Sequence, residues 1–272
     1  MREIIYPIDV IAANKRRQRA SPTYHAAAVV QREITDRLLE RLDYMLIQPQ
    51  AILELGEGLA TEALQNRFPN ATVVTKNIVE IFDASTHALR LPCENASQQL
   101  IVANLVLHWC VDPKQVLTEI RRVLRADGVL LFSTMGPDSL RELRQAFAEV
   151  DNQHHVHEFL DMHDLGDVLQ ELGYVDPVVD MHTLRVKYPD VIDLCRDLQH
   201  LGASNVHLDR HRGLFGKKKW QRVLQAYRAQ NNEGNVYASY ELVFGLAWGI
   251  RQLSRDGEVS IPLSSLFNKV DE

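Results

Sequence analysis

The chain is poor in cysteine and has no long apolar segment. Three cysteines, Cys93, Cys110 and Cys195, occur in its 272 residues. They are odd in number and far apart, which predicts reduced thiols and no metal site. No apolar run approaches the roughly 20 residues that cross a bilayer, and no signal-peptide core follows the basic stretch at residues 15–19. We therefore expect a cytoplasmic protein that is not inserted in a membrane.

The chain also lacks the positive charge that is typical of nucleic-acid-binding proteins, because its formal net charge is −6. One segment differs: Asp209–Arg222 reads DRHRGLFGKKKWQR and has six basic residues against one aspartate. This segment is either an ordinary solvated loop and helix start or a docking patch for an acidic partner. Its basic residues are Arg210, Arg212, Lys217, Lys218, Lys219 and Arg222.

Apolar runs of strand length alternate with stretches of helical periodicity along most of the chain, which predicts an α/β fold with a parallel sheet and right-handed crossovers. Strands are predicted at residues 51–55, 71–75, 100–107, 129–134, 178–188 and 237–248. Helices are predicted at residues 25–45, 60–66, 113–124, 139–150, 160–172, 191–201 and 217–230. The polar segment VDNQHHVHEF at residues 150–159 contains His154, His155 and His157 without carboxylate or cysteine partners at ligand spacing, so we expect a loop or lid and no metal site.

The segment ILELGEGLATEAL (Ile52–Leu64) combines an apolar strand, two glycines and the start of a helix. Rossmann-like domains hold a nucleotide-type cofactor on the backbone amides of such a loop. Gly56 allows the tight turn, and Gly58 lets a ligand approach the backbone closely. The alternative is that both glycines only end the strand tightly.

The segment LRLPCENASQQLIVANLVLHWCVDPKQVLTEIRRVLRADGVLLFST resembles the second half of the core of class I S-adenosylmethionine-dependent methyltransferases. Later segments, among them MGPDSLRELRQAF and SYELVFGLAWG, are similar to the malonyl-acyl-carrier-protein O-methyltransferases of biotin (pimeloyl) synthesis. The resemblance covers about residues 14–250, and complex I assembly factors share a fainter version of it.

The resemblance implies a Rossmann-like fold with a mostly parallel seven-stranded sheet, helices on both faces and a helical lid. We expect an N-terminal helical segment at residues 1–45, a methyltransferase domain at 46–255 and a tail at 256–272. The lid is expected at about residues 137–175 and 203–232.

The resemblance also implies S-adenosylmethionine as the cofactor, held by Tyr24, Glu54, Gly56, Gly58, Asn77 and Asn104. In the family, a small residue stands where this chain has Glu57, an acidic residue binds the ribose hydroxyls where it has Asn77, and an aspartate near His87 binds adenine. Losing two charge-assisted hydrogen bonds would weaken cofactor binding by roughly 10²–10⁴-fold.

Candidate catalytic residues follow the strand at 100–107: Asn104, His108 and Trp109. Each has a purely structural alternative, as a turn, a hydrogen-bonded histidine or a packing residue. A malonyl carboxylate is ionised at neutral pH, so its methylation requires a positive partner and no general base. By position, Arg141, Arg144 and Arg185 are the candidates. An acyl-carrier protein is acidic, so the basic run at 210–222 is its expected landing site.

The sequence therefore predicts a methyltransferase that esterifies the malonyl group on acyl-carrier protein. The first alternative is an inactive or repurposed protein of the same fold that acts as a binding or assembly factor. A third hypothesis, a dinucleotide-dependent dehydrogenase, uses the same glycine loop, but the late segments resemble methyltransferases instead.

Overall fold

The protein forms a mixed sheet of six strands in the order β2-β1-β3-β4-β6-β5. The computed structural model describes residues 6–77, 90–230 and 236–249. The strands are β1 (Ala51–Leu55), β2 (Thr72–Lys76), β3 (Gln98–Asn104), β4 (Leu124–Met135), β5 (Val175–Tyr188) and β6 (Val236–Trp248). Strand β6 runs antiparallel to both of its neighbours, β4 and β5, and the pairings among β2, β1, β3 and β4 are parallel. The predicted mostly parallel α/β sheet is confirmed, with six strands in the described parts of the chain where seven were expected.

The strand order reverses beside β1. The chain passes from β1 through a helix to β2 at one edge, and then returns to place β3 on the other side of β1. Both pairings are parallel, so the carboxyl ends of the three strands lie together. Ligands of open α/β sheets bind at such a reversal, because the loops that follow the strands diverge there.

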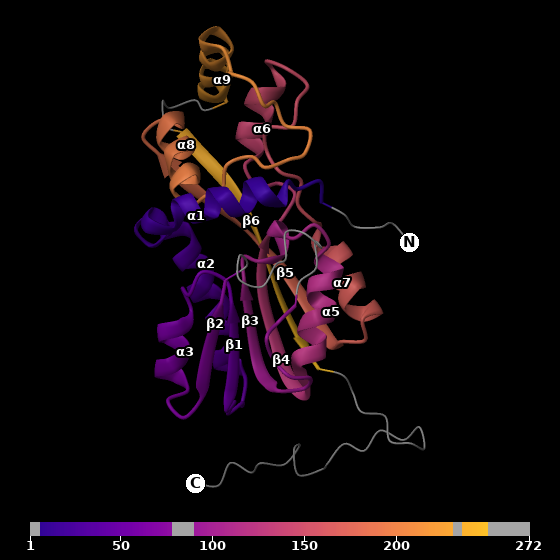
Figure 1. Cartoon of the computed structure of the whole chain (residues 1–272). Coiled ribbons are helices and arrows are strands. Elements are labelled where there is room, and N and C mark those ends of the chain that lie inside the picture. Colours follow the sequence, from indigo (N-terminus) through magenta and orange to yellow (C-terminus); the bar gives the residue numbers. More distant parts are fainter. Residues whose placement is uncertain (1–5, 78–89, 231–235, 250–272) are drawn as a thin grey trace.

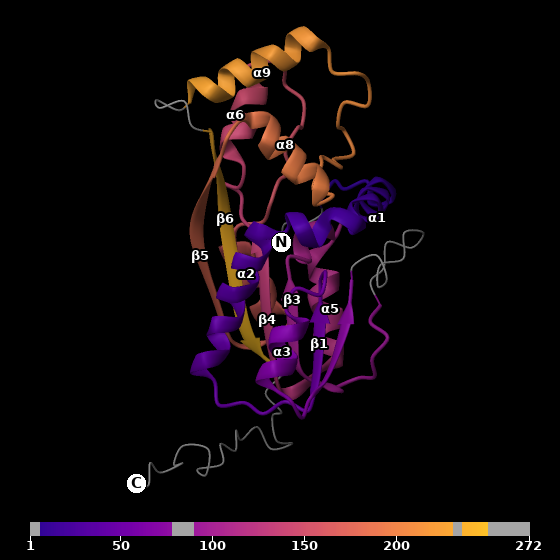
Figure 2. The same ribbon diagram turned by 90° about the vertical axis from the view of Figure 1, so that its left-hand side faces the viewer.

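Helices cover both faces of the sheet and one end of it (Figures 1 and 2). They are α1 (Val10–Ala27), α2 (Val29–Glu40), α3 (Thr61–Arg67), α5 (Pro113–Val123), α6 (Arg141–Ala148), α7 (Met162–Glu171), α8 (Val191–His200) and α9 (Lys217–Ala229), with short 3-10 turns at Arg41–Tyr44 and Leu107–Trp109. On one face, α5 and α7 pack against the sheet; α2 and α3 cover the other. In Figure 1, α6, α8 and α9 lie together at the upper end of the molecule.

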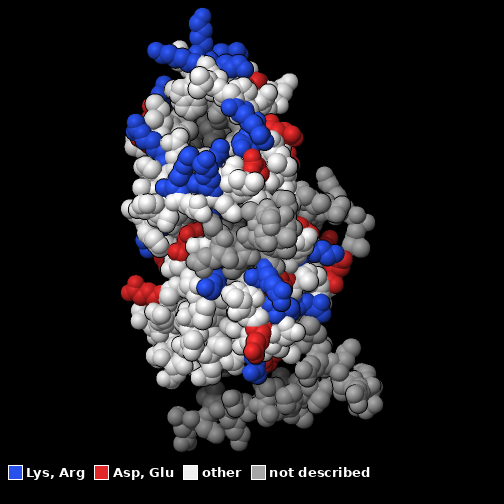
Figure 3. Space-filling view, in the orientation of Figure 1, with Lys and Arg blue, Asp and Glu red and all other residues white. Residues whose placement is uncertain are grey.

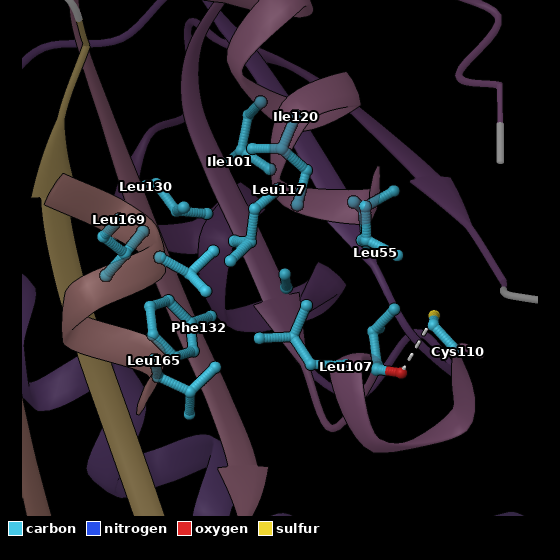
Figure 4. Close-up of a cluster of buried hydrophobic side chains, with 14 of the residues drawn as sticks. Leu55, Ile101, Leu107, Cys110, Leu117, Ile120, Leu130, Phe132, Leu165 and Leu169 are labelled. Carbon is cyan, nitrogen blue, oxygen red and sulfur yellow. Dashed lines mark hydrogen bonds between the residues drawn. The ribbon is translucent and has the colours of Figure 1, made fainter. Parts of the chain in front are cut away.

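The core under α5 and α7 is apolar and closely packed (Figure 4). Leu117 of α5, Leu165 of α7 and Phe132 of β4 belong to the same cluster, and all three side chains are fully buried. The helical spacing of the apolar residues in both helices explains why the sequence predicts them. The segment 162–171 was expected within the lid, but as α7 it belongs to the layer that covers the sheet.

The N-terminal segment consists of two main helices where one was expected at residues 25–45. Asp9 caps α1, since its carboxylate accepts a hydrogen bond from the Ala12 amide at 3.0 Å. Ala28 leaves the helical conformation, with φ −75° and ψ 45°, and separates α1 from α2. Apart from Val10, the residues that α1 buries are alanines, Ala13 and Ala20. So small an apolar face leaves little periodic signal in the sequence, which is why α1 was not predicted over its full length.

Strand β3 ends at Asn104, three residues earlier than the apolar run 100–107 predicted. Leu105 adopts φ 56°, a left-handed conformation that ends the strand. Its amide donates hydrogen bonds to both the backbone and the side-chain oxygen of Ser133 on β4. Leu107 then opens a 3-10 turn. The apolar residues beyond Asn104 are buried because they line the end of the sheet and not because they extend the strand.

The three cysteines are all described and free: Cys110 is buried, and Cys93 and Cys195 are half-buried. Among the described residues, no cluster of histidine, cysteine or carboxylate side chains has the arrangement of a metal site. No helix in the described ranges combines the length and the hydropathy that a membrane span requires.

We predict that Gly245→Ala destabilises the protein by roughly 1–3 kcal/mol, because overpacking a dense core forces its neighbours to move. A Cβ at Gly245 would lie 2.0 Å from Cζ of the buried Phe132. The midpoint of urea unfolding measures the effect. The control is Gly166→Ala in α7, where an added Cβ meets no atom within 4 Å and the helix gains propensity. Equal midpoints for the two variants would contradict the packing described for β4 and β6.

Candidate active site

A cavity of about 350 Å³ lies at the carboxyl ends of the strands. Its floor includes Asn104 and Leu105 after β3 and Met135 at the end of β4. The 3-10 turn with His108 and Trp109 forms one wall. Much of the remaining wall comes from α1, α8 and the loop between α6 and α7, and Gln31 of α2, Glu57 of the glycine loop, Leu143 of α6, Trp220 of α9 and Tyr240 of β6 also contribute. The residues from α1, α8 and the loop are Arg17, Tyr24, Cys195, Leu198, Gln199, His155, Val156, His157 and Phe159. This position coincides with the reversal of strand order beside β1.

The glycine loop approaches β3 closely. Gly56 has φ 146°, and a Cβ there would lie 2.9 Å from the Asn104 carbonyl oxygen. The Gly56 amide donates to the Lys76 carbonyl at 3.0 Å, so Asn77 follows directly beside the loop. Gly58 has φ 78°, and its own Cβ would meet only ordinary contacts. Gly56 is therefore required by both conformation and space, and Gly58 by conformation.

Glu54 holds the loop in shape. Its buried carboxylate accepts hydrogen bonds from the Ala60 amide at 2.9 Å and from the Thr61 hydroxyl. The Thr75 hydroxyl approaches it at 3.3 Å from β2. Glu54 is not among the residues that line the cavity. Its expected contact with the methionine amine stays a prediction, because these bonds account for its burial without a ligand.

Glu57, the unusual residue of the loop, forms an ion pair with Arg17 of α1. The Arg17 guanidinium also lies over the Trp109 ring, 5.0 Å from the ring centroid. The side chains of Arg17 and Glu57 are 10% and 23% exposed. The negative charge that Glu57 brings to the loop is therefore neutralised at the edge of the cavity by a residue 40 positions earlier in the chain.

Asn104 joins three elements. Its side-chain amide donates to the Thr35 hydroxyl of α2 at 2.7 Å, and its side-chain oxygen accepts from the Ser133 hydroxyl of β4 at 2.6 Å. Because both ends of the amide are engaged, Asn104 fixes the floor of the cavity. The two interpretations of Asn104, structural turn and active-site floor, are thus compatible.

His108 and Trp109 both line the cavity, as does Tyr24, whose pKa is raised by burial. Burial, with the nearby charge of Arg17, lowers the pKa of His108 to about 3. Burial also lowers the pKa of His157 to about 4. Both imidazoles are therefore neutral at pH 7. Nδ1 of His108 lies 3.2 Å from the Thr134 hydroxyl, which orients the ring.

The three arginines proposed as substrate ligands are absent from the lining of the cavity. Arg144 donates to the carbonyls of Pro137, Ser139 and His157, and so ties α6 to the lid loop. Arg141 is exposed near Asp138 and Glu142. The guanidinium of Arg185 lies 4.8 Å from the Tyr237 ring centroid. Their role in binding substrate stays a prediction.

The basic run falls into two parts. Arg210 is 14% exposed and pairs with Asp9 at 2.8 Å, so it anchors the loop before α9 to the start of α1. Lys217 and Lys218 at the start of α9 are exposed, as is Arg212. Lys219 lies 3.4 Å from Asp151, and Arg222 donates to the Glu149 carbonyl. Figure 3 shows Lys and Arg side chains gathered at this upper end of the molecule.

Two buried polar atoms in the cavity wall support a polar ligand. Nε of Arg17 and Oε1 of Gln31 have no hydrogen-bond partner within the described parts of the chain. Such groups are costly to leave unpaired, so they favour a ligand that carries both a donor and an acceptor. S-adenosylmethionine, with its amine and carboxylate, fits this requirement. His87 and the helical turn expected near it lie outside the described residues.

Sequence reasoning missed Arg17 and Gln31. A signal for Arg17 was present, because it precedes Tyr24 by seven residues on α1, and positions seven apart lie on the same face of a helix. Gln31 lies on α2, beyond the break at Ala28, so helical spacing from Tyr24 does not place it. The contribution of α8 and of Tyr240 on β6 was also missed. No local pattern marks those residues, because they reach the cavity through the way that α8 and β6 pack in the folded protein.

A family model described as a methyltransferase domain matches residues 53–132, from β1 into β4. A putative methyltransferase from Bacillus halodurans has a similar fold, with a TM-score of 0.51 and 14% identity over 79% of this chain and 98% of its own. The chain is thus an S-adenosylmethionine-dependent methyltransferase by class, as the sequence predicts.

The chain belongs more specifically to the malonyl-[acyl-carrier protein] O-methyltransferase family. The protein of that name from Nitrosospira multiformis is 38% identical, over 89% of each chain. A second, from Gallionella capsiferriformans, is 36% identical over 95% of this chain and 98% of its own. A third, malonyl-[acyl-carrier protein] O-methyltransferase 1 from Coxiella burnetii, is 38% identical over 97% and 98%.

We predict that acidification destabilises the protein through His108 and His157. Their pKa values of about 3 and about 4 lie below the ordinary 6.5. The unfolded chain therefore binds more protons between pH 6.5 and those values, and stability falls as the pH falls through this window. At pH 5, each imidazole accounts for up to about 2 kcal/mol of the loss.

Urea unfolding between pH 7.5 and pH 5 measures this dependence. The variants His108→Gln and His157→Gln are expected to lose less stability over that range than the wild type does. The exposed His163, whose ring pairs with Asp161, provides the control variant His163→Gln. Parallel pH dependences in all four proteins would contradict the prediction.

Proposed function

We propose that the protein transfers the methyl group of S-adenosylmethionine to the free carboxylate of a malonyl group carried by acyl-carrier protein, in the synthesis of the pimeloyl chain of biotin. The observation that supports this most directly is the cavity, which lies beside the glycine loop and opens under the lid formed by α6, α8 and α9. The family membership supports the same acceptor.

When bound, S-adenosylmethionine supplies an electrophilic methyl group on a sulfonium. Gly56, Gly58 and Asn77 would hold it beside β1, with Tyr24 covering the pocket. A malonyl carboxylate would accept that methyl group without losing a proton, because it is already ionised at pH 7. The protein therefore needs to align two groups and exclude water, and it requires no general base.

The side chains beside the cavity suit this chemistry. His108 is neutral at pH 7, so it does not repel the sulfonium. Trp109 and Phe159 give the wall an apolar surface that excludes water. Asn104, with its amide engaged at both ends, keeps the floor rigid. We expect these residues to position the two reactants.

Mass spectrometry of malonyl-acyl-carrier protein incubated with S-adenosylmethionine tests this function. The expected product is the carrier protein heavier by one methyl group, with no change for acetyl-acyl-carrier protein, which lacks the free carboxylate. The alternative is an inactive protein of this fold that binds a partner protein as an assembly factor and transfers no methyl group. The ion pair of Glu57 with Arg17 on the glycine loop favours this alternative. No methylation and no calorimetric binding of S-adenosylhomocysteine at millimolar concentration would establish that alternative.

We further propose that the start of α9 is the landing site of the carrier protein. The exposed Lys217 and Lys218 supply positive charge, and the neighbouring Leu214 is 99% exposed. An exposed apolar side chain beside lysines suits an acidic partner that also buries an apolar contact. Arg212 extends the same surface.

We expect Lys218→Glu to raise KM for malonyl-acyl-carrier protein about fivefold and to leave kcat unchanged, because a charge at the rim of an interface acts mainly on association. The effect should shrink as salt is added. The control is Arg67→Glu on α3, at the lower end of the molecule in Figure 1. Equal KM values for the two variants would contradict the proposal that the carrier protein binds at α9.

A further inference from the structure

Arg17 is the one arginine or lysine among the described residues that line the cavity. It comes from α1 and reaches the cavity beside the glycine loop, where its side chain is 10% exposed. Trp109 covers one face of the guanidinium. A positive charge so far from solvent must be compensated by a negative group, from the protein or from a ligand.

The hydrogen bonding of Arg17 is incomplete. Within the described parts of the chain, Nη2 donates to Glu57, and the buried Nε has no partner. A guanidinium presents Nε and one Nη side by side, which matches the two oxygens of a carboxylate. A carboxylate that binds Arg17 through two oxygens would therefore accept a hydrogen bond from the unpaired Nε as well as one from Nη2.

Glu57 is the present counter-ion of Arg17, and it satisfies only one of these donors. It stands on the loop beside which the cofactor would lie, and its side chain is 23% exposed. A ligand carboxylate and the Glu57 carboxylate would compete for the same guanidinium, since two anions beside one cation repel each other.

We propose that Arg17 binds the carboxylate of the ligand, and that in the ligand-free protein the Glu57 carboxylate pairs with Arg17 and so competes with the ligand. The inference rests on the proposed function for its two sources of carboxylate: the amino-acid end of the cofactor and the free end of the malonyl group. If the malonyl group is the source, Arg17 takes the role that was expected of Arg141, Arg144 and Arg185.

The two partners of the ion pair should have opposite effects on binding. Arg17→Gln removes the positive partner, so a ligand carboxylate is bound at least tenfold more weakly. Glu57→Gln removes the competitor and keeps a side chain of similar size, so the same ligand is bound severalfold more tightly. A salt bridge that only stabilises the fold would make both variants weaker binders.

Isothermal titration calorimetry with paired probes tests the proposal. S-adenosylhomocysteine is compared with methylthioadenosine, which lacks the amino acid, and malonyl-acyl-carrier protein with acetyl-acyl-carrier protein. In one of the two pairs, Arg17→Gln should bind the probe with the carboxylate more weakly than the wild type does, and Glu57→Gln should bind it more tightly. Both variants should bind the probe of that pair that lacks the carboxylate as the wild type does. The affected pair identifies the source of the carboxylate.

Two further variants keep the result interpretable. Arg17→Lys retains the charge without the planar fork, and it should bind with intermediate affinity. Arg19→Gln removes an exposed arginine from the same helix and should behave as the wild type does. Thermal unfolding of every variant shows whether it is folded, and Glu57→Gln alone tests the proposal if Arg17→Gln does not fold.

The outcomes separate this inference from the proposed function. Methylation by the wild type, together with unchanged binding of all probes by Arg17→Gln, would overturn the role of Arg17 and leave the function standing. Binding of a carboxylate probe by Glu57→Gln, lost when Arg17 is also changed, would support Arg17 even if the wild type transfers no methyl group. No binding of any probe to the wild type and to Glu57→Gln would overturn both.

Discussion

The close approach of the glycine loop to the end of β3 is the constraint on which the rest of the site depends. Gly56 leaves no room for a Cβ against the Asn104 carbonyl oxygen, 2.9 Å away. The same loop bonds to β2 through Lys76 and is held from below by Glu54. The carboxyl ends of β1, β2 and β3 are thereby held together. Side chains from distant elements form the walls of the cavity above them.

Charge inside this cavity is tightly balanced. Burial keeps His108 and His157 neutral at pH 7. Arg17 is the one arginine or lysine, and Glu57 the one aspartate or glutamate, among the described residues that line the cavity. If a ligand carboxylate binds Arg17 as proposed, it must rearrange this ion pair, and ligand binding is then linked to one interaction between α1 and the glycine loop.

Local patterns predicted the elements that carry a strong periodic signal. The amphipathic helices α5 and α7, the buried β3 and the glycine turn were all expected near their observed positions, because their apolar spacing reports directly on burial. The end of β3 was placed three residues too late, since a buried stretch after a strand looks like the strand itself. The helix α1 was largely missed because the residues that it buries, apart from Val10, are alanines. Arg144 illustrates a third limit: its charge suggested substrate binding, but three carbonyl oxygens occupy it.

The sequence by itself determined the class of fold, the location of the glycine loop and the family to which the chain belongs. These properties depend on residues that are neighbours in the chain, such as Gly56 and Gly58, or on the spacing of apolar side chains. Only the tertiary structure decided which charges meet in the cavity. Arg17 and Glu57 lie 40 residues apart, and their contact arises because α1 crosses the carboxyl end of the sheet. Ion pairing depends on distance in space, and no local spacing in the sequence encodes it.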